Sequence, residues 1–215
     1  MPKFDHVGDV SPALLIQLAP GERVMVPMDS VRYRDPAIQV DRVKYTYPNP
    51  VGRFPANFWH YFETLDGPGA ATVSIGTVGE IRLGTLAAGE TVMLHGAALL
   101  AHEATMKYDV VTLVTYQLPR AIISHYVTAA RLTGPGQFAF QTHGNALTFN
   151  LKAGETIRTD PASLLSMTAG MNLRPSVFGG SPHFPPMHYF ALLDITGPGT
   201  VLVHSGRLVH TMEGG

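Results

Sequence analysis

The sequence predicts an all-β protein built from three tandem copies of one double-sheet module, of the β-sandwich or jelly-roll kind. Two repeated markers carry this prediction. Gly-Pro-Gly stands before a β-like run three times, about 65 residues apart, at 67–69, 134–136 and 197–199. Gly-Glu follows an apolar run with a similar period, at 21–22, 89–90 and 154–155. Such self-similarity is typical of a chain that stacks copies of one structural unit.

The segments between these markers predict strands. Residues 110–116, 137–141 and 200–204 are short runs rich in Val, Thr, Phe and Leu, bounded by turn residues. Residues 11–18 also carry a helix signal, a Ser N-cap followed by Pro. Their copies at 83–86 and 148–151 contain Gly, Thr and Phe, which are poor helix formers. We therefore predict strands in all three copies.

The order of the markers predicts how the modules are completed. The units are expected at 13–66, 67–133 and 134–196, and the first lacks the opening strands that the other two have. Residues 197–215 supply a spare set. We therefore expect the two termini to complete one module together. This closes one compact pseudo-threefold body over residues 1–215 with no free sheet edge.

Composition excludes several classes of protein. The 215 residues are 45% hydrophobic and 14% charged, with a net charge of −1 and no Lys/Arg cluster, so nucleic-acid binding is not expected. The absence of cysteine excludes disulfides, thiolate metal sites and Cys nucleophiles. No apolar run reaches the roughly 20 residues of a membrane span, so no direct membrane insertion is expected. Residues 1–5 have no apolar signal-peptide core, so we expect no secretory signal and a cytoplasmic protein.

Histidine precedes tyrosine shortly before each Gly-Pro-Gly, at His60, His125 and His188. A pseudo-threefold axis could gather these three imidazoles, and three His ligands suit Zn²⁺ with an open fourth position. We favour the structural alternative, in which each ring packs at a strand end, because repeated units repeat their structural residues. His102-Glu103 comes nearest to a jelly-roll metal motif but lacks a second histidine at the required spacing. No metal ligand and no cofactor is assigned.

Other candidate groups also have structural interpretations. Glu22, Glu90 and Glu155 could act as acids or bases, but a Gly-Glu pair between strands is more typical of a turn. Trp59 lies in the densest aromatic stretch, residues 54–62, which could form a partner surface or, as we favour, the core of a module. Residues 178–190 are expected to form an ordered loop.

The motifs resemble those of the altered inheritance of mitochondria protein 24 family. The matching stretches are 18–22, 86–90 and 151–155, the three Gly-Pro-Gly strands, and 178–180. The resemblance implies a pseudo-trimer of three β-modules, each similar to a subunit of the tryptophan RNA-binding attenuation protein. It implies no catalytic residue. Fungal members are linked to mitochondrial inner-membrane organisation, which suggests scaffolding. This chain departs from the pattern at Arg32, Arg34 and Asp35-Pro36.

The sequence therefore favours a non-enzymatic binding or scaffolding protein that associates with itself or with an unknown protein partner. The binding candidates are His60, His125, His188 and Trp59, and no catalytic residue is assigned. The alternative function is a metal-dependent jelly-roll enzyme with a His cluster. RNA binding by analogy with the attenuation protein conflicts with the chain's charge.

Overall fold

The computed structural model describes residues 1–9, 11–47, 58–76, 78–117, 124–178 and 190–205. Over these residues the chain is all-β, as predicted, with nineteen strands, two single-turn 3-10 helices and no α-helix. The strands form four sheets. Residues 13–18 form a strand, which confirms the strand interpretation of the segment that carries a helix signal.

One N-terminal strand, β1 (Lys3–Val7), precedes three groups of six strands. The first group is β2 (Ala13–Leu18), β3 (Arg23–Pro27), β4 (Val31–Arg34), β5 (Gln39–Tyr47), β6 (Phe58–Asp66) and β7 (Gly69–Val73). The second is β8 (Ile81–Leu86), β9 (Thr91–Leu94), β10 (Leu99–Glu103), β11 (Lys107–Gln117), β12 (Ser124–Thr133) and β13 (Gly136–Gln141). The third is β14 (Ala146–Leu151), β15 (Thr156–Thr159), β16 (Leu164–Thr168), β17 (Asn172–Phe178), β18 (Phe190–Thr196) and β19 (Gly199–His204). Helix η1 (Gly96–Ala98) precedes β10, and η2 (Pro161–Ser163) precedes β16.

The same turn recurs in each group. The glycine before each glutamate, Gly21, Gly89 or Gly154, has a φ of 81° to 83°, which a residue with a Cβ rarely adopts. The glutamate carbonyl accepts the backbone N–H of the first glycine of Gly-Pro-Gly at 2.9 to 3.0 Å. A Cβ on that glycine would lie 2.3 to 2.5 Å from the carbonyl oxygen of Ala19, Ala87 or Lys152. Close backbone approach therefore explains why glycine opens this motif.

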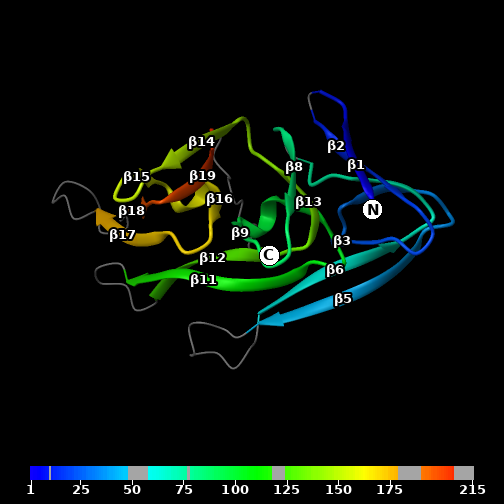
Figure 1. Cartoon of the computed structure of the whole chain (residues 1–215), viewed down its shortest axis with the longest axis horizontal. Coiled ribbons are helices and arrows are strands. Elements are labelled where there is room, and N and C mark those ends of the chain that lie inside the picture. The colour runs from blue at the N-terminus through cyan, green and yellow to red at the C-terminus, as the bar shows by residue number, and fades with distance from the viewer. Residues whose placement is uncertain (10, 48–57, 77, 118–123, 179–189, 206–215) are drawn as a thin grey trace, which may run out of the picture.

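Two six-stranded sheets join the groups. Their strand orders are β5-β6-β3-β10-β13-β8 and β11-β12-β9-β16-β19-β14. At the first junction Met25 of β3 lies opposite His102 of β10, and at the second Met93 of β9 lies opposite Met167 of β16. The remaining sheets have the strand orders β1-β2-β7-β4 and β15-β18-β17. β4 is one edge of the first of these sheets, and β15 is one edge of the second. Figure 1 shows β1 and β2 near one end of the molecule and β15, β17 and β18 near the other.

The pairing of the Gly-Pro-Gly strands differs from the predicted grouping. β19 pairs with β14 and β16 of its own group, and β7 pairs with β2 and β4. In each group the strand that begins at Gly-Pro-Gly therefore pairs with earlier strands of the same group. Residues 197–204 consequently do not complete the unit at 13–66. The bond from Gly67 N–H to the Glu22 carbonyl starts β7 directly beside the end of β2.

The charged residues of β4, Arg32 and Arg34, have a physical explanation. Arg32 stands at the position of Leu100 and Leu165, which are fully buried at the two junctions. A third junction of the same kind would pair β15 with β4 and place Arg158 opposite Arg34. Like charges directly opposite each other destabilise a strand pair, and a polar outer face is typical of the end of a repeat array. β4 and β15 are edge strands of different sheets, so the described strands have free sheet edges where the sequence predicted none. The pseudo-threefold arrangement itself stays a prediction.

The apolar core runs through both junctions. One cluster fills the first group and takes in Leu100, Ala101 and Ala139 from the second group. The next cluster fills the second group and takes in Met25 and Phe62 from the first. Packing across the junctions therefore holds the groups together in addition to the strand pairs. The third cluster is smaller: Leu164, Met167, Met171, Leu193, Ile195, Val201 and Val203.

Candidate functional site

The predicted histidine triplet falls only partly within the described residues. His60 lies on β6 opposite Tyr45, and His125 lies on β12 opposite Tyr116. These strands belong to different sheets. Trp59 lies on β6 opposite Thr46. The side chains of these residues, and the whole of His188, lie outside what the structure describes, so their grouping stays a prediction. Within the described residues, no three His, Asp or Glu side chains gather as a metal site requires.

The repeated glutamates hold the Gly-Glu turns. Oε2 of Glu22 accepts the backbone N–H of Ala19 at 2.8 Å. Oε2 of Glu90 and of Glu155 accepts the equivalent N–H group, three residues earlier, at 2.7 Å. The three carboxylates therefore satisfy a backbone donor that the turn leaves free of the ladder. This contact confirms the structural interpretation of the Gly-Glu pairs.

The pair His102-Glu103 lies at the first junction. Both residues are buried, at 0% and 7% exposure, but successive side chains of a strand point to opposite faces. His102 faces the cluster with Phe62 and stacks on Tyr108, with ring centroids 5.9 Å apart. Glu103 lies opposite Val24, whose side chain belongs to the other cluster. The two groups therefore do not converge on one ligand.

The protonation of His102 follows from its partners. Its Nδ1 lies 2.9 Å from the carbonyl oxygen of Glu103, which can only accept, so Nδ1 carries the proton. Nε2 is then a buried acceptor with no hydrogen-bond partner among the described residues. Burial lowers the pKa of His102 to about 4, and the bond to the Glu103 carbonyl opposes this shift. His102 is thus a neutral core histidine at physiological pH.

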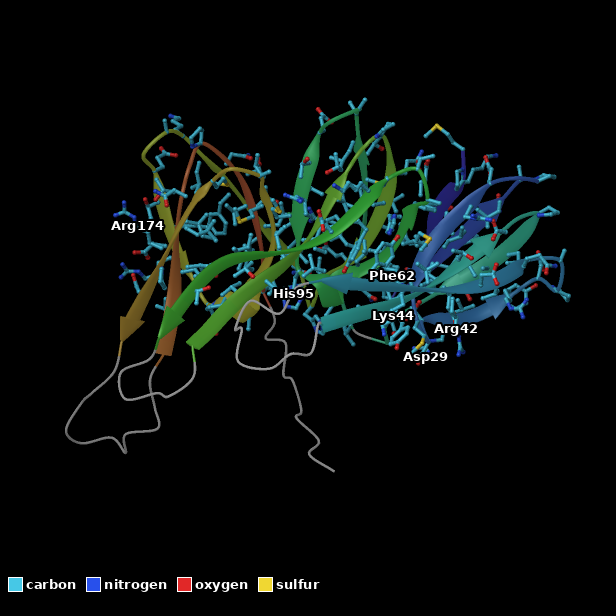
Figure 2. All side chains as sticks on the ribbon, turned by 90° about the horizontal axis from the view of Figure 1, so that it is seen from below. Asp29, Arg42, Lys44, Phe62, His95 and Arg174 are labelled. Atoms are coloured by element: carbon cyan, nitrogen blue, oxygen red, sulfur yellow. The ribbon has the colours of Figure 1, made fainter. Side chains whose placement is uncertain are left out.

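A second histidine cluster lies where β19 ends. His204 is 3% exposed, and its ring packs edge to face against His143 with centroids 5.5 Å apart. Burial, followed by the nearby charges of His143 and His95, lowers the pKa of His204 to about 4. Figure 2 places His95 near the middle of the length of the molecule, and this residue is half-buried. The structure therefore brings together His143 and His204, two histidines that the sequence did not group.

The sheet edges are the remaining candidate surface. An edge strand presents unpaired backbone N–H and C=O groups to any strand that can add to it. Eight described strands are edges: β1, β4, β5, β8, β11, β14, β15 and β17. Seven of them carry a charged side chain, among them Lys3, Arg32, Arg42, Arg82, Lys107, Arg158 and Arg174. Figure 2 shows Arg42 and Arg174 near opposite ends of the molecule. β14 alone among these eight has no charge.

A comparison with protein families decides the family of this chain. The family model described as "Mitochondrial biogenesis AIM24" matches residues 4–206. The chain belongs to the AIM24 family. The match extends over nearly the whole AIM24-family chain and confirms the resemblance predicted from the repeated motifs. No curated protein matches the chain. Among the residues that the structure describes, no helix is long and apolar enough to cross a membrane.

Solved structures show the same fold as this AIM24-family chain. The X-ray crystal structure of protein SPYM3_0169 from Streptococcus pyogenes superposes with a TM-score of 0.71. The superposition covers 96% of this chain and 94% of that one, at 15% sequence identity. At this identity the likeness establishes the arrangement of the strands and nothing about a ligand.

Two features of the surface and core of this AIM24-family chain were not predicted from its sequence. Ser74 and Gln141 occupy the positions equivalent to His204, so the repeat carries no histidine signal there. The uncharged edge β14 was predicted as a strand, but its place at an edge depends on pairing between distant segments. A comparison of charge among the predicted strands could have singled it out.

Proposed function

We propose that this chain is a non-enzymatic binding or scaffolding protein that associates with itself. The observation that carries the proposal is the set of open sheet edges, whose backbone groups can take up a further strand. The repeated carboxylates, which could otherwise have suggested acid–base chemistry, are bound to backbone N–H groups of their own turns. The description of the matching family names a process, mitochondrial biogenesis, and no reaction.

The metal-dependent enzyme has less support. His102 and Glu103 lie on opposite faces of β10, and within the described ranges no cluster of three metal-binding side chains occurs. His143 and His204 are in contact, but the Nδ1 of His204 is occupied by a backbone N–H. Self-association through strand edges needs no such cluster, and we favour it for that reason.

Sedimentation velocity tests the proposal. The chain has a mass of 23.2 kDa. We expect the untagged protein to form a species of at least twice this mass as its concentration rises, and we expect no stoichiometric metal in elemental analysis of the dialysed protein. A species of single-chain mass at every concentration would contradict self-association. Stoichiometric metal that is lost with a His60→Ala, His125→Ala, His188→Ala variant would favour the enzyme. A cytoplasmic location is part of the proposal, and cell fractionation tests it.

A further inference from the structure

β14 differs from the other edge strands in its side chains. Its sequence, Ala-Leu-Thr-Phe-Asn-Leu, has no charge and no proline, the two features that most often protect an edge from pairing. Leu147 and Phe149 are 47% and 37% exposed. They lie on one face of the strand, two residues apart, opposite Val203 and Val201 of β19. Both valines are buried in the third core cluster, so the apolar surface of that core extends onto an open edge.

The first group shows what covers the equivalent edge. β2 corresponds to β14, with Leu14 and Ile16 at the positions of Leu147 and Phe149. There the edge is covered by β1, which pairs with β2 in antiparallel fashion and places Phe4 opposite Ile16. Leu14 and Ile16 are both 0% exposed. The same apolar positions are thus buried in the group whose edge has an added strand.

The second group shows an edge of the opposite kind. β8 corresponds to β14 but has Arg82 and Gly84 at the two positions. Arg82 binds the carboxylate of Glu80 at 2.9 Å, and the ring of Phe138 covers Gly84. A charge and a covered glycine therefore replace the two apolar side chains of β14. Figure 1 shows β8 and β14 as separate strands of the molecule, so each edge can be tested alone.

We propose that β14 pairs with β14 of a second copy of this chain, antiparallel, about a twofold axis at Thr148. This inference rests on the proposed self-association and names its surface. In this register Leu147 of each copy lies opposite Phe149 of the other, and Thr148 lies opposite Thr148. Directly opposite side chains share one face of a sheet, so all four apolar side chains meet on the face of the third core cluster. The two six-stranded sheets become one continuous sheet.

A second copy suits this edge because the strand is complementary to itself. An isologous contact requires that the same patch serve both partners, and the register about Thr148 sets Leu147 against Phe149 and Thr148 against Thr148. No like charges meet, because β14 contains no charged residue. A twofold axis at Tyr33 would set Arg32 of one β4 opposite Arg34 of the other, and an axis at Arg158 would set that arginine of β15 opposite itself.

A disulfide trap tests the register directly. The chain has no cysteine, so Thr148→Cys introduces a single thiol at an exposed position. Opposite Cβ atoms in an antiparallel pair are roughly 4.5–5.5 Å apart, close to the range of a disulfide. We expect mild oxidation to convert most of the Thr148→Cys protein to a covalent dimer. Thr85→Cys, at an exposed position of β8, is the matched control, and we expect it to form no covalent dimer. Equal crosslinking of the two variants would overturn the proposal.

Charge at the edge tests the energetics and separates this inference from the proposed function. We expect Phe149→Lys to weaken self-association roughly tenfold or more, because each lysine places a charge opposite Leu147 of the other copy and diagonal to the other lysine. Leu83→Lys, on the 50% exposed Leu83 of β8, should leave it unchanged. Circular dichroism of each variant checks the fold. If the wild type and Phe149→Lys assemble equally, self-association stands and the β14 surface is wrong. If the wild type stays single, both proposals fail.

Discussion

The backbone N–H of His143 donates to Nδ1 of His204 across 2.8 Å, and this bond fixes the proton of His204 on Nε2. Nε2 is buried and has no hydrogen-bond partner among the described residues. A second proton would have to displace the His143 N–H from Nδ1 and would leave a charged ring in the core. The contact therefore stabilises the neutral form of His204, which agrees with a pKa of about 4.

Acid should destabilise the protein through its two buried histidines. His102 and His204 have a pKa of about 4 when folded and 6.5 when unfolded, so the unfolded chain binds protons first. Stability is therefore full above pH 6.5 and falls as the pH drops from 6.5 towards 4. We expect a loss of roughly 2 kcal/mol per histidine near pH 5. Urea denaturation at about pH 7.5 and about pH 5 measures it.

A variant identifies the source of this pH dependence. His102→Leu removes the titrating ring from an apolar cluster and should reduce the loss between the two pH values by about half. Asp194 gives no contribution in this range. Hydrogen bonds from Arg158 and Ser176 lower its pKa to about 2, so its effect begins only below its ordinary value of 3.8. Equal unfolding midpoints of the wild type at the two pH values would contradict the account of both histidines.

The Gly-Glu carboxylates should matter for stability through their backbone bonds. Glu155→Ala removes the acceptor for the N–H of Lys152 and should cost about 1 kcal/mol of unfolding free energy. Glu155→Gln keeps an oxygen acceptor in the same place and should retain most of it. Thermal or urea unfolding distinguishes the two variants. A Gln variant as unstable as the Ala variant would mean that the negative charge matters more than the hydrogen bond.

Gly84 should not tolerate a side chain. A Cβ at this position would lie 2.3 Å from Cζ of Phe138, whose ring covers the glycine on the neighbouring strand. We expect Gly84→Ala to lower the free energy of unfolding by about 1–3 kcal/mol, because the ring must move within a packed core. Thr85→Ala, on the adjacent exposed residue, is the control and should change little. Equal stability of the two variants would show that the Phe138 ring moves at little cost.

Removal of the arginines at the ends of the array should create a new junction. Arg34→Met together with Arg158→Met would place Met opposite Met, as Met167 lies opposite Met93 at the second junction. Because β4 and β15 belong to sheets at different ends of the array, we expect larger assemblies than the wild type forms, detected by light scattering. Arg42→Met on β5 is the control, with no expected change. An unchanged mass of the double variant would contradict the idea that these arginines block the edge.

The features that the sequence predicted are those that depend on neighbouring residues. Gly21 and Glu22 form a turn through contacts within four residues, so their period was sufficient to predict the strands on either side. The pairing of β7 with β2 rather than of β19 with β2 depends on segments more than fifty residues apart. The two pairings have the same local sequence pattern. The prediction placed β19 beside β2, whereas the structure places β7 there.

The candidate sites follow the same rule. The contact between His143 and His204 joins residues 61 positions apart and has no counterpart in the other groups. Edge position is likewise a property of the whole sheet: β13 and β14 are both short apolar strands, but β13 lies between β10 and β8, whereas β14 has one neighbour among the described strands. The sequence shows that β14 has no charged residue, but only the sheet order shows that this uncharged strand lies at an edge.

Hydrogen exchange of the β14 amides, measured at low and high protein concentration, tests the central claim most directly. If β14 pairs with β14 of a second copy, the amides of residues 146–151 that face away from β19 become protected as concentration rises. The amides of β8, at the equivalent edge of the other sheet, exchange at the same rate throughout. Equal, concentration-independent exchange at both edges would contradict the claim that this chain assembles through its uncharged edge strand.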